Sequence, residues 1–462
     1  MRITVFGAAG GVGSRVVAEA LARGHEVTAV VRRQAQLSSL PAQAQGRLGD
    51  ATRVEQVAAL SAGQDLVISA TRPASGNEQD LVAAAKALLA GVTKSGARLL
   101  LVGGAASLRV PDTGGLVVDD SRYAPAVVRD IAVACHHQFE ACTEDDKADW
   151  TYISPPALLV PGERTGCYQL GRHDLLMNHE GVSRISIEDF AVALLDEAES
   201  PKHRGARFTV AARALDVTES DVTVETQDGV ADCYFVRPTS GIYPGVIAWP
   251  DALGLRSAFR TIGKRLAQSG YSVLVINPHY RVTAAPIGVT ADDFSKPVGR
   301  ESVMSLARSI TPDMTARDAF AFAGYLDAQG SVDPKRKLGT VGYCIGGAMA
   351  FRTAAARADR VGAIASFHGS KLVTREAGSP HLLIPSMGAS ALVAIAENDD
   401  RREPNTKTVL HEAYHKAELS AEIEVYAGTT HGWCAPDVKA YDRAQAERAW
   451  SRLLTLFGKA LA

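Results

Sequence analysis

A cysteine between closely spaced glycines constrains this chain more than any other feature. Residues 338–343 form an apolar, strand-like run, and Cys344 follows, flanked by Gly342 and Gly346 ahead of an alanine-rich helical stretch. Glycines at these two positions let a strand and a helix approach closely while the side chain between them points outward. The helix that begins here directs free N–H groups and a positive dipole end at that side chain, which favours a thiolate. The sequence therefore predicts a reactive cysteine, and a buried packing cysteine is the alternative interpretation.

An acid and a histidine follow this cysteine along the chain, each just past a predicted strand. The apolar run 391–396 precedes Asp399, and the strand-like run 421–426 precedes His431. In open parallel sheets, active sites are built at the carboxyl ends of the strands. The order nucleophile, acid, histidine, with each residue at a strand end, therefore predicts a Cys-His-Asp catalytic triad.

Residues from about 217 to 462 resemble the dienelactone hydrolase family, the cysteine-dependent branch of the α/β-hydrolases. The resemblance implies that Cys344 is the nucleophile, His431 the base and Asp399 the residue that orients the base; the adjacent Asp400 competes for the acid role, and the family spacing favours Asp399. It also implies hydrolysis of lactones or small carboxylic esters through an acyl-enzyme, without a cofactor. The segments that carry the resemblance are residues 342–347, 396–399, 426–433 and the terminal helical stretch 444–453.

Attack on an ester carbonyl creates an oxyanion that preorganised backbone N–H groups must receive. We expect one donor to be the N–H of Ile345, directly after the cysteine, and the other to be the N–H of Ala252, in the loop that follows a long apolar strand. The resemblance places Asp251 where the family carries a glutamate that interacts with the resting cysteine. A helix N-cap is the alternative role for Asp251.

The chain departs from the family pattern after the histidine. Dienelactone hydrolases bind the substrate carboxylate with arginines, one of them just after the catalytic histidine, whereas no arginine occurs among the five residues after His431. An anionic dienelactone is therefore not the expected substrate. Trp249 and Trp433 indicate either a more apolar acyl pocket or ordinary core residues. The long polar segment 281–312 is predicted to be a lid or loop over the site.

The first half of the chain begins with a strand, a glycine-rich loop, a helix and a second strand, the last over residues 26–31. This order is the start of a dinucleotide-binding fold. Gly7 permits the tight turn, Gly10 lets the backbone approach a pyrophosphate, and Gly13 allows close packing of helix on strand. The N-terminus of the helix would then hold the phosphates.

The end of the second strand indicates which cofactor is bound. Two arginines stand there instead of the acidic residue that binds the ribose 2′-hydroxyl of NAD, and arginine accommodates the 2′-phosphate of NADP. NADP(H) is therefore favoured, NAD(H) stays an alternative, and solvated surface charges are the remaining interpretation of the arginines. The residues expected to contact the cofactor are Gly7, Ala9, Gly10, Gly11, Val12, Gly13, Arg32, Arg33, Asp50, Ala70 and Thr71.

Residues 1–213 resemble the atypical short-chain dehydrogenase group, with its NmrA-like or epimerase-like NAD(P)-binding fold. Typical members carry a Tyr-x-x-x-Lys pair that exchanges a proton with the substrate, and no tyrosine of this half has a lysine four residues later. Cofactor binding is therefore expected, and reduction is open. Two alternatives follow: a bifunctional reductase and hydrolase acting on consecutive steps, or a hydrolase regulated by a non-catalytic NADP(H)-sensing domain.

The whole chain is expected to form two α/β domains, a Rossmann-type doubly wound parallel sheet (1–213) and an α/β-hydrolase fold (217–462) that opens with a hairpin around residue 228. Its 46% hydrophobic and 22% charged residues are ordinary for soluble globular proteins. A net charge of −2 implies no polyanionic partner, so nucleic acid is not expected. No apolar stretch is long enough to span a bilayer.

The six cysteines are scattered without a zinc-binding pattern, so we expect no metal and reduced thiols in a cytoplasmic setting. The expected partner is a small-molecule lactone or ester. The sequence is also compatible with an oligomer.

Overall fold

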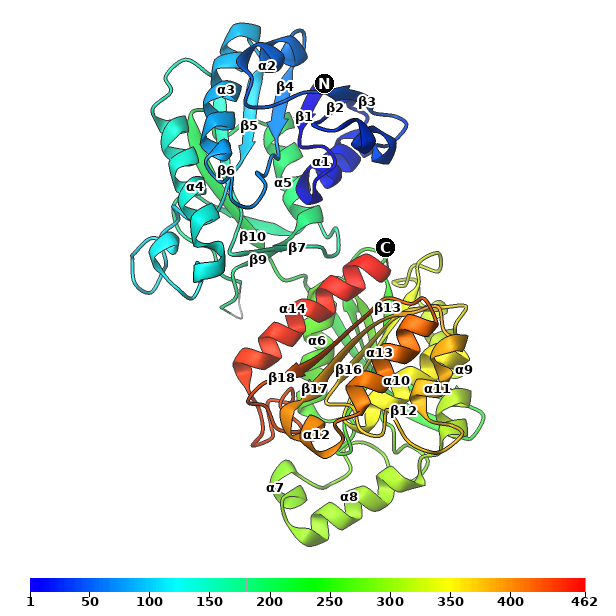
Figure 1. Cartoon of the computed structure of the whole chain (residues 1–462). Helices are drawn as coiled ribbons and strands as arrows, with labels where there is room; N and C mark the ends of the chain where they lie inside the picture. Colours follow the sequence, from blue (N-terminus) through cyan, green and yellow to red (C-terminus); the bar gives the residue numbers. More distant parts are fainter. Residues whose placement is uncertain (179–180, 462) are drawn as a thin grey trace. The chain divides into compact units, whose positions relative to one another are not determined.

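The computed structural model describes residues 1–178 and 181–461. It divides into two compact units, Met1–Ala214 and Leu215–Ala462, each of which has its own sheet and its own cores (Figure 1).

The first unit is built on an eight-stranded sheet in the order β3-β2-β1-β4-β5-β6-β10-β8, in which only β8 is antiparallel to its neighbour. Its central strands are buried on both faces, as their runs of Val, Ile and Leu require in a parallel sheet. The strands are β1 (Arg2–Phe6), β2 (Glu26–Val31), β3 (Gln45–Leu48), β4 (Leu66–Ser69), β5 (Arg98–Val102), β6 (Trp150–Ser154), β8 (Tyr168–Gly171) and β10 (Ala206–Ala212), and β7 (Leu158–Val160) pairs with β9 (Arg184–Ser186) in a separate ribbon.

Helices cover both faces of this sheet. One core joins the sheet to α1 and α5, and a second core joins its other face to α2, α3 and α4. This doubly wound arrangement confirms the Rossmann-type fold expected for the first half. The helices are α1 (Gly11–Ala22), α2 (Val54–Ser61), α3 (Asp80–Ser95), α4 (Ala126–Thr143) and α5 (Ile187–Glu199).

The second unit also contains an eight-stranded sheet, in the order β11-β12-β14-β13-β15-β16-β17-β18. The predicted hairpin is present as β11 and β12, and the strands from β14 to β18 are all parallel. This is the expected α/β-hydrolase fold. The strands are β11 (Val217–Thr226), β12 (Gly229–Pro238), β13 (Gly245–Trp249), β14 (Ser272–Ile276), β15 (Leu338–Tyr343), β16 (Val361–Phe367), β17 (Ser390–Ala396) and β18 (Ala421–Tyr426).

Two large cores lie on the opposite faces of this sheet, one under α9, α10 and α13 and the other under α6 and α14. Because every parallel strand points the same way, the residues that follow β13, β15, β16, β17 and β18 come out at one edge. The helices are α6 (Ser257–Gln268), α9 (Pro312–Asp327), α10 (Ile345–Ala356), α12 (Glu397–Arg402), α13 (Thr406–Lys416) and α14 (Arg443–Ala460).

The segment 281–312 is largely helical. It contains α7 (Ala291–Phe294), with a capping box from Thr290, and α8 (Pro297–Ser309), with proline in its first turn. Proline at that position costs no hydrogen bond, because the first N–H groups of a helix have no partner inside it. Figure 1 shows α7 and α8 at the same end of the second unit as α12, which follows β17.

Candidate active site and cofactor cavity

The turn that carries Cys344 is sterically demanding. Cys344 has a φ of +54°, in the left-handed region that non-glycine residues rarely adopt, and α10 starts at the next residue. A Cβ at Gly342 would lie 1.9 Å from the carbonyl oxygen of Gly346, and a Cβ at Gly346 would lie 2.4 Å from that of Trp249. Both glycines are therefore required by close approach of the backbone. The turn leaves Cys344 half-buried at the carboxyl edge of the sheet.

His431 and Asp399 meet across two loops that are joined by further hydrogen bonds. His431 Nδ1 donates to Asp399 Oδ2 (2.6 Å), while the backbone N–H of His431 donates to Asn398 Oδ1 (2.8 Å). The N–H of Gly428 donates to Glu397 Oε2 (2.5 Å). The loop after β17 thus fixes the position of the histidine. It also fixes the orientation of the ring, because Nδ1 is bound to the carboxylate and Nε2 is left to bind another group.

That partner is the sulfur of Cys344. Burial disfavours the charged form of His431, but the hydrogen bonds to the Asp399 carboxylate and to the Cys344 sulfur outweigh burial and raise the pKa of His431 to about 10. An imidazole with this pKa is positively charged at neutral pH and can stabilise a negative sulfur beside it. The three predicted residues are therefore brought together, from the ends of three different strands.

The carboxylate of Asp400, the competing acid, forms an ion pair with Lys407 and not with His431. Trp249 and Trp433 are both fully buried core residues. Trp249 donates from Nε1 to Thr353, and Trp433 stacks on Tyr426. Both tryptophans are therefore core residues, which is the second of the two interpretations given above.

The two expected oxyanion donors, Ile345 and Ala252, lie at the start of α10 and in the loop after β13. Ile345 is the first residue of α10, so its N–H has no partner within the helix. Ala252 lies in the buried loop after β13, and its carbonyl oxygen accepts a hydrogen bond from His279 Nε2 (2.9 Å). Burial lowers the pKa of His279, so the imidazole that anchors this loop is neutral.

Asp251 has other partners than the resting cysteine. Its carboxylate forms a two-pronged ion pair with Arg256 (2.7 and 3.0 Å) and accepts the N–H of Leu253 (2.9 Å). The Arg256 guanidinium also binds both carboxylate oxygens of Asp437, six residues after His431. Arg256 therefore ties the loop after β13 to the loop that carries the histidine.

Two residues of the turn after β16 adjoin the site, and the sequence analysis did not select them. Ser370 Oγ lies 3.7 Å from Cys344 Sγ, and the Ser370 N–H donates to the Cys344 carbonyl oxygen (2.9 Å). The ring of His368 meets that of His431 edge to face, with centroids 5.0 Å apart. Burial and the charge of His431 hold the pKa of His368 well below its usual range, so this second histidine is neutral. A His-Gly-Ser sequence directly after an apolar strand was the available signal.

The first unit contains a cavity of about 660 Å³ at the carboxyl ends of β1, β2 and β4. Strand order reverses between β1 and β4, which is where open α/β sheets bind ligands. Gly7, with a φ of +80°, makes the turn out of β1. Nine of the eleven residues expected to contact the cofactor line this cavity: Gly7, Ala9, Gly10, Gly11, Val12, Arg32, Asp50, Ala70 and Thr71.

The other two expected residues, Gly13 and Arg33, do not line the cavity. Gly13 packs α1 on the loop, because a Cβ there would lie 2.1 Å from the carbonyl oxygen of Gly7. Arg33 precedes the short 3₁₀ helix Gln34–Ser39, and its backbone N–H donates a hydrogen bond to Gln36 Oε1 (3.1 Å). The lining of the cavity therefore lacks Arg33, which was expected to contact the cofactor: consecutive residues at a strand end point to opposite sides, and of the two arginines Arg32 is the one that lines the cavity.

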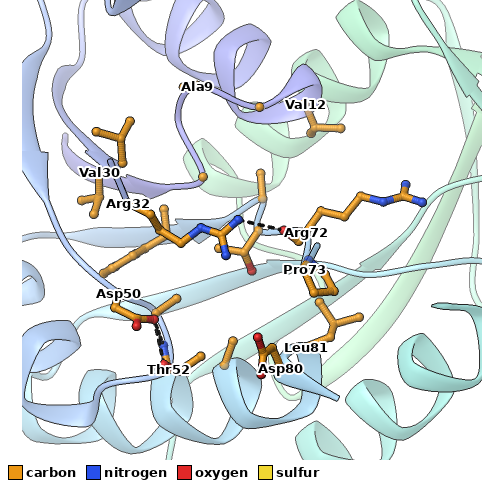
Figure 2. A pocket seen from close by; sticks show the side chains of 18 of the residues that line it. Ala9, Val12, Val30, Arg32, Asp50, Thr52, Arg72, Pro73, Asp80 and Leu81 are labelled. Carbon is orange, nitrogen blue, oxygen red and sulfur yellow. Dashed lines mark hydrogen bonds between the residues drawn. The ribbon is translucent and has the colours of Figure 1, made fainter. Parts of the chain in front are cut away.

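Figure 2 shows how the polar groups of the cavity are arranged. Arg32 donates to the carbonyl oxygen of Arg72 (3.4 Å) across the cavity, and Asp50 accepts from the N–H (2.9 Å) and hydroxyl (2.7 Å) of Thr52. Burial alone would raise the pKa of Asp50, but these bonds from Thr52, with Arg53 and Arg32 nearby, lower it. The sequence analysis missed Gln36, Thr52 and Arg72 as lining residues.

No helix in the described residues is both long enough and apolar enough to cross a membrane.

The second unit is an α/β-hydrolase, and the first is a Rossmann-type dinucleotide-binding domain. Residues 231–461 match the model of the dienelactone hydrolase family, which covers half of the chain, and residues 7–198 match the model of an NAD(P)H-binding domain. The chain belongs to the dienelactone hydrolase family and carries an NAD(P)H-binding domain in its N-terminal half.

Three known proteins illustrate these similarities. The uncharacterized protein YwnB of Bacillus subtilis is 35% identical over 221 residues, which are 46% of this chain and 100% of YwnB. A Synechocystis protein provisionally named a carboxymethylenebutenolidase is 26% identical over 247 residues, 53% of this chain and 97% of that protein. A Klebsiella pneumoniae crystal structure provisionally described as a dienelactone hydrolase is 22% identical, covers 53% of this chain and 99% of its own, and has a TM-score of 0.45.

Proposed function

We propose that the second unit is a cysteine-dependent hydrolase of lactones or small carboxylic esters, with Cys344 as the nucleophile. The observation that carries the proposal is the coupling of His431 to both Asp399 and Cys344, which raises the pKa of His431 to about 10. A cysteine is nucleophilic as a thiolate, and a charged imidazole beside it supplies the balancing charge. The membership of the dienelactone hydrolase family supports the same reaction class.

In the first half of the reaction, the Cys344 sulfur attacks the carbonyl carbon and a C–S bond forms. The carbonyl oxygen becomes an oxyanion, which the N–H groups of Ile345 and Ala252 receive. As the intermediate collapses, the C–O bond to the leaving alcohol breaks and His431 gives its Nε2 proton to that oxygen. The product is a thioester on Cys344; for a lactone, the new hydroxyl stays attached to the acyl group.

In the second half, His431 is neutral because it has given its Nε2 proton to the leaving alcohol. Its Nε2 accepts a proton from water while the water oxygen attacks the thioester carbon. Collapse of this second oxyanion breaks the C–S bond and releases the acid, and the thiolate and the charged imidazole are restored. Asp399 holds Nδ1 throughout, so that Nε2 faces the reacting atoms.

We also propose that the first unit binds NADP(H) in its cavity. The cavity fits a dinucleotide, since the glycine loop leaves space for a pyrophosphate at the start of α1 and Arg32 faces inward at the end of β2. Arg32 would contact the 2′-phosphate, and Asp50, Ala70 and Thr71 would border the adenosine half. A nicotinamide cofactor supplies hydride-transfer chemistry when it is bound.

The hydrolase proposal is tested with a short p-nitrophenyl ester and an enol-lactone, using the wild type, Cys344→Ala and Cys434→Ala. Cys434 is the matched control, because burial raises its pKa well above the ordinary value and keeps it a neutral thiol. We expect loss of hydrolysis in Cys344→Ala alone. Comparable turnover by Cys344→Ala and the wild type would refute the nucleophile.

A further inference from the structure

A small apolar cluster joins α8 to the loop after β13. Val303 of α8 is wholly buried, and it packs with Ala252 and Leu253 in a cluster separate from the two large cores of the second unit. Ile345 adjoins the same cluster, as does Phe294 at the end of α7.

This cluster lies beside the proposed reaction centre. Ala252 and Ile345 are the residues whose N–H groups are assigned to the oxyanion, so the carbonyl carbon of a bound substrate must lie within a few ångströms of both. The side chains that pack on these two residues then border the space available to a substituent of that carbon. Val303 supplies one of these side chains from α8.

Val303 is the one fully buried residue of α8, and Ala307, one turn further on, is half-buried against the same cluster. Val298, on the same helix, is 84% exposed. Arg308 pairs with Glu301 on the surface, and Lys296 pairs with Asp293. Val303 is therefore the most deeply buried contact between this helix and the loop after β13, with Ala307 beside it.

We propose that α8 closes the acyl pocket of the hydrolase and that Val303 limits the size of the acyl group that can be bound on Cys344. The substrates are then neutral esters or lactones with a short, apolar acyl part. This inference rests on the proposed function, because it assigns the specificity of the same site. It agrees with the absence of arginine among the five residues after His431.

The physical basis is the cost of adding or removing volume in a packed contact. One methylene more or less in an apolar pocket changes the relative rate of two substrates by roughly 10- to 200-fold. Replacing valine by alanine removes two methyl groups at a position where the surrounding side chains relax only partially. The space that is left can be filled by a longer acyl chain.

The test measures kcat/KM for p-nitrophenyl acetate and p-nitrophenyl hexanoate in the wild type, Val303→Ala and Val298→Ala. We expect the hexanoate-to-acetate ratio to rise about tenfold in Val303→Ala, by the effect of one methylene group. Val298→Ala, the matched control on the exposed side, should keep the wild-type ratio. An active Val303→Ala enzyme with the wild-type ratio would overturn the inference.

A second variant keeps the test decisive if Val303→Ala does not fold. Val303→Ile adds one methylene group at the same place and should lower the hexanoate-to-acetate ratio, while an unchanged ratio in an active enzyme would overturn the inference. If the wild type shows no Cys344-dependent hydrolysis of either ester, the proposed function itself fails. The two failures are therefore distinguishable.

Discussion

The carboxylate of Asp399 and the imidazole of His431 lie 2.6 Å apart although 32 residues separate them in the chain. Asn398, next to Asp399, accepts the backbone N–H of His431, so the loop after β17 holds the histidine at two points. One contact fixes the backbone and the other fixes the ring. This pairing determines which nitrogen of His431 faces Cys344. It also distinguishes Asp399 from its neighbour Asp400, whose carboxylate pairs with Lys407 instead.

Replacing Asp399 should therefore disable the proposed hydrolase, and replacing Asp400 should not. Asp399→Asn keeps the shape but removes the charge that stabilises the imidazolium, so we expect kcat to fall roughly 10²- to 10⁴-fold. Asp400→Asn breaks only the pair with Lys407 and should leave kcat within about threefold, because this partly exposed pair does not involve His431 or Cys344. Ester hydrolysis by the two variants checks the prediction, and equal losses would contradict it.

The raised pKa of His431 predicts a pH dependence of stability. Its pKa is about 10 in the folded chain against an ordinary value of 6.5, so the folded state binds this proton more tightly than the unfolded state. The resulting stabilisation is fully present below pH 6.5 and is lost as the pH rises through 10. Urea unfolding of the wild type and His431→Gln should show a difference in unfolding free energy that shrinks from pH 6.5 to pH 10. A difference that grows over this range would show that the histidine is not held in its charged form.

The glycines of the cysteine turn should tolerate no side chain. Gly342→Ala places a Cβ 1.9 Å from the Gly346 carbonyl oxygen, so the strand and the helix must separate. We expect a loss of roughly 2–3 kcal/mol of unfolding free energy or more. Gly324→Ala is the matched control, because this glycine lies inside α9 with open space around it. It should be neutral or stabilising by about 0.5–1 kcal/mol, and thermal or urea unfolding of both variants measures the contrast.

The two arginines after β2 should differ in their effect on the cofactor. Arg32 faces the cavity and Arg33 does not. Arg32→Glu should weaken NADPH binding by at least about tenfold and NADH binding much less, since its guanidinium would pair with the 2′-phosphate. Arg33→Glu should change neither affinity by more than about threefold. Fluorescence titration with both cofactors is the measurement, and an unchanged NADPH preference in Arg32→Glu would refute the assignment.

Local signals were sufficient to predict much of the fold. The second strand (26–31) and the last strand (421–426) have the predicted bounds, and the hairpin around Asp228 is present. Buried parallel strands read as continuous apolar runs, and glycines at their ends mark the turns. The same signals put the candidate triad residues at the correct sheet edge, because strand ends are where parallel sheets expose side chains.

Contacts between distant segments could not be predicted in this way. The pair of Asp251 with Arg256 and the approach of Ser370 to Cys344 depend on how loops pack, which strand patterns do not specify. The burial of Val303 in a polar segment is of the same kind. Arg32 and Arg33 could not be told apart from the sequence for a different reason. They are adjacent residues of the same type, and only the direction of the backbone at the end of β2 determines which of them lines the cavity.

The most direct test of the account is to look for the acyl group on Cys344 itself. The wild type is mixed with p-nitrophenyl acetate, quenched in acid during turnover and digested, and the peptides are analysed by mass spectrometry. We expect an acetyl thioester on the peptide that contains Cys344, and no acetyl group on that peptide in Cys344→Ala. Rapid hydrolysis by both proteins with no acylated cysteine in either would contradict the central claim.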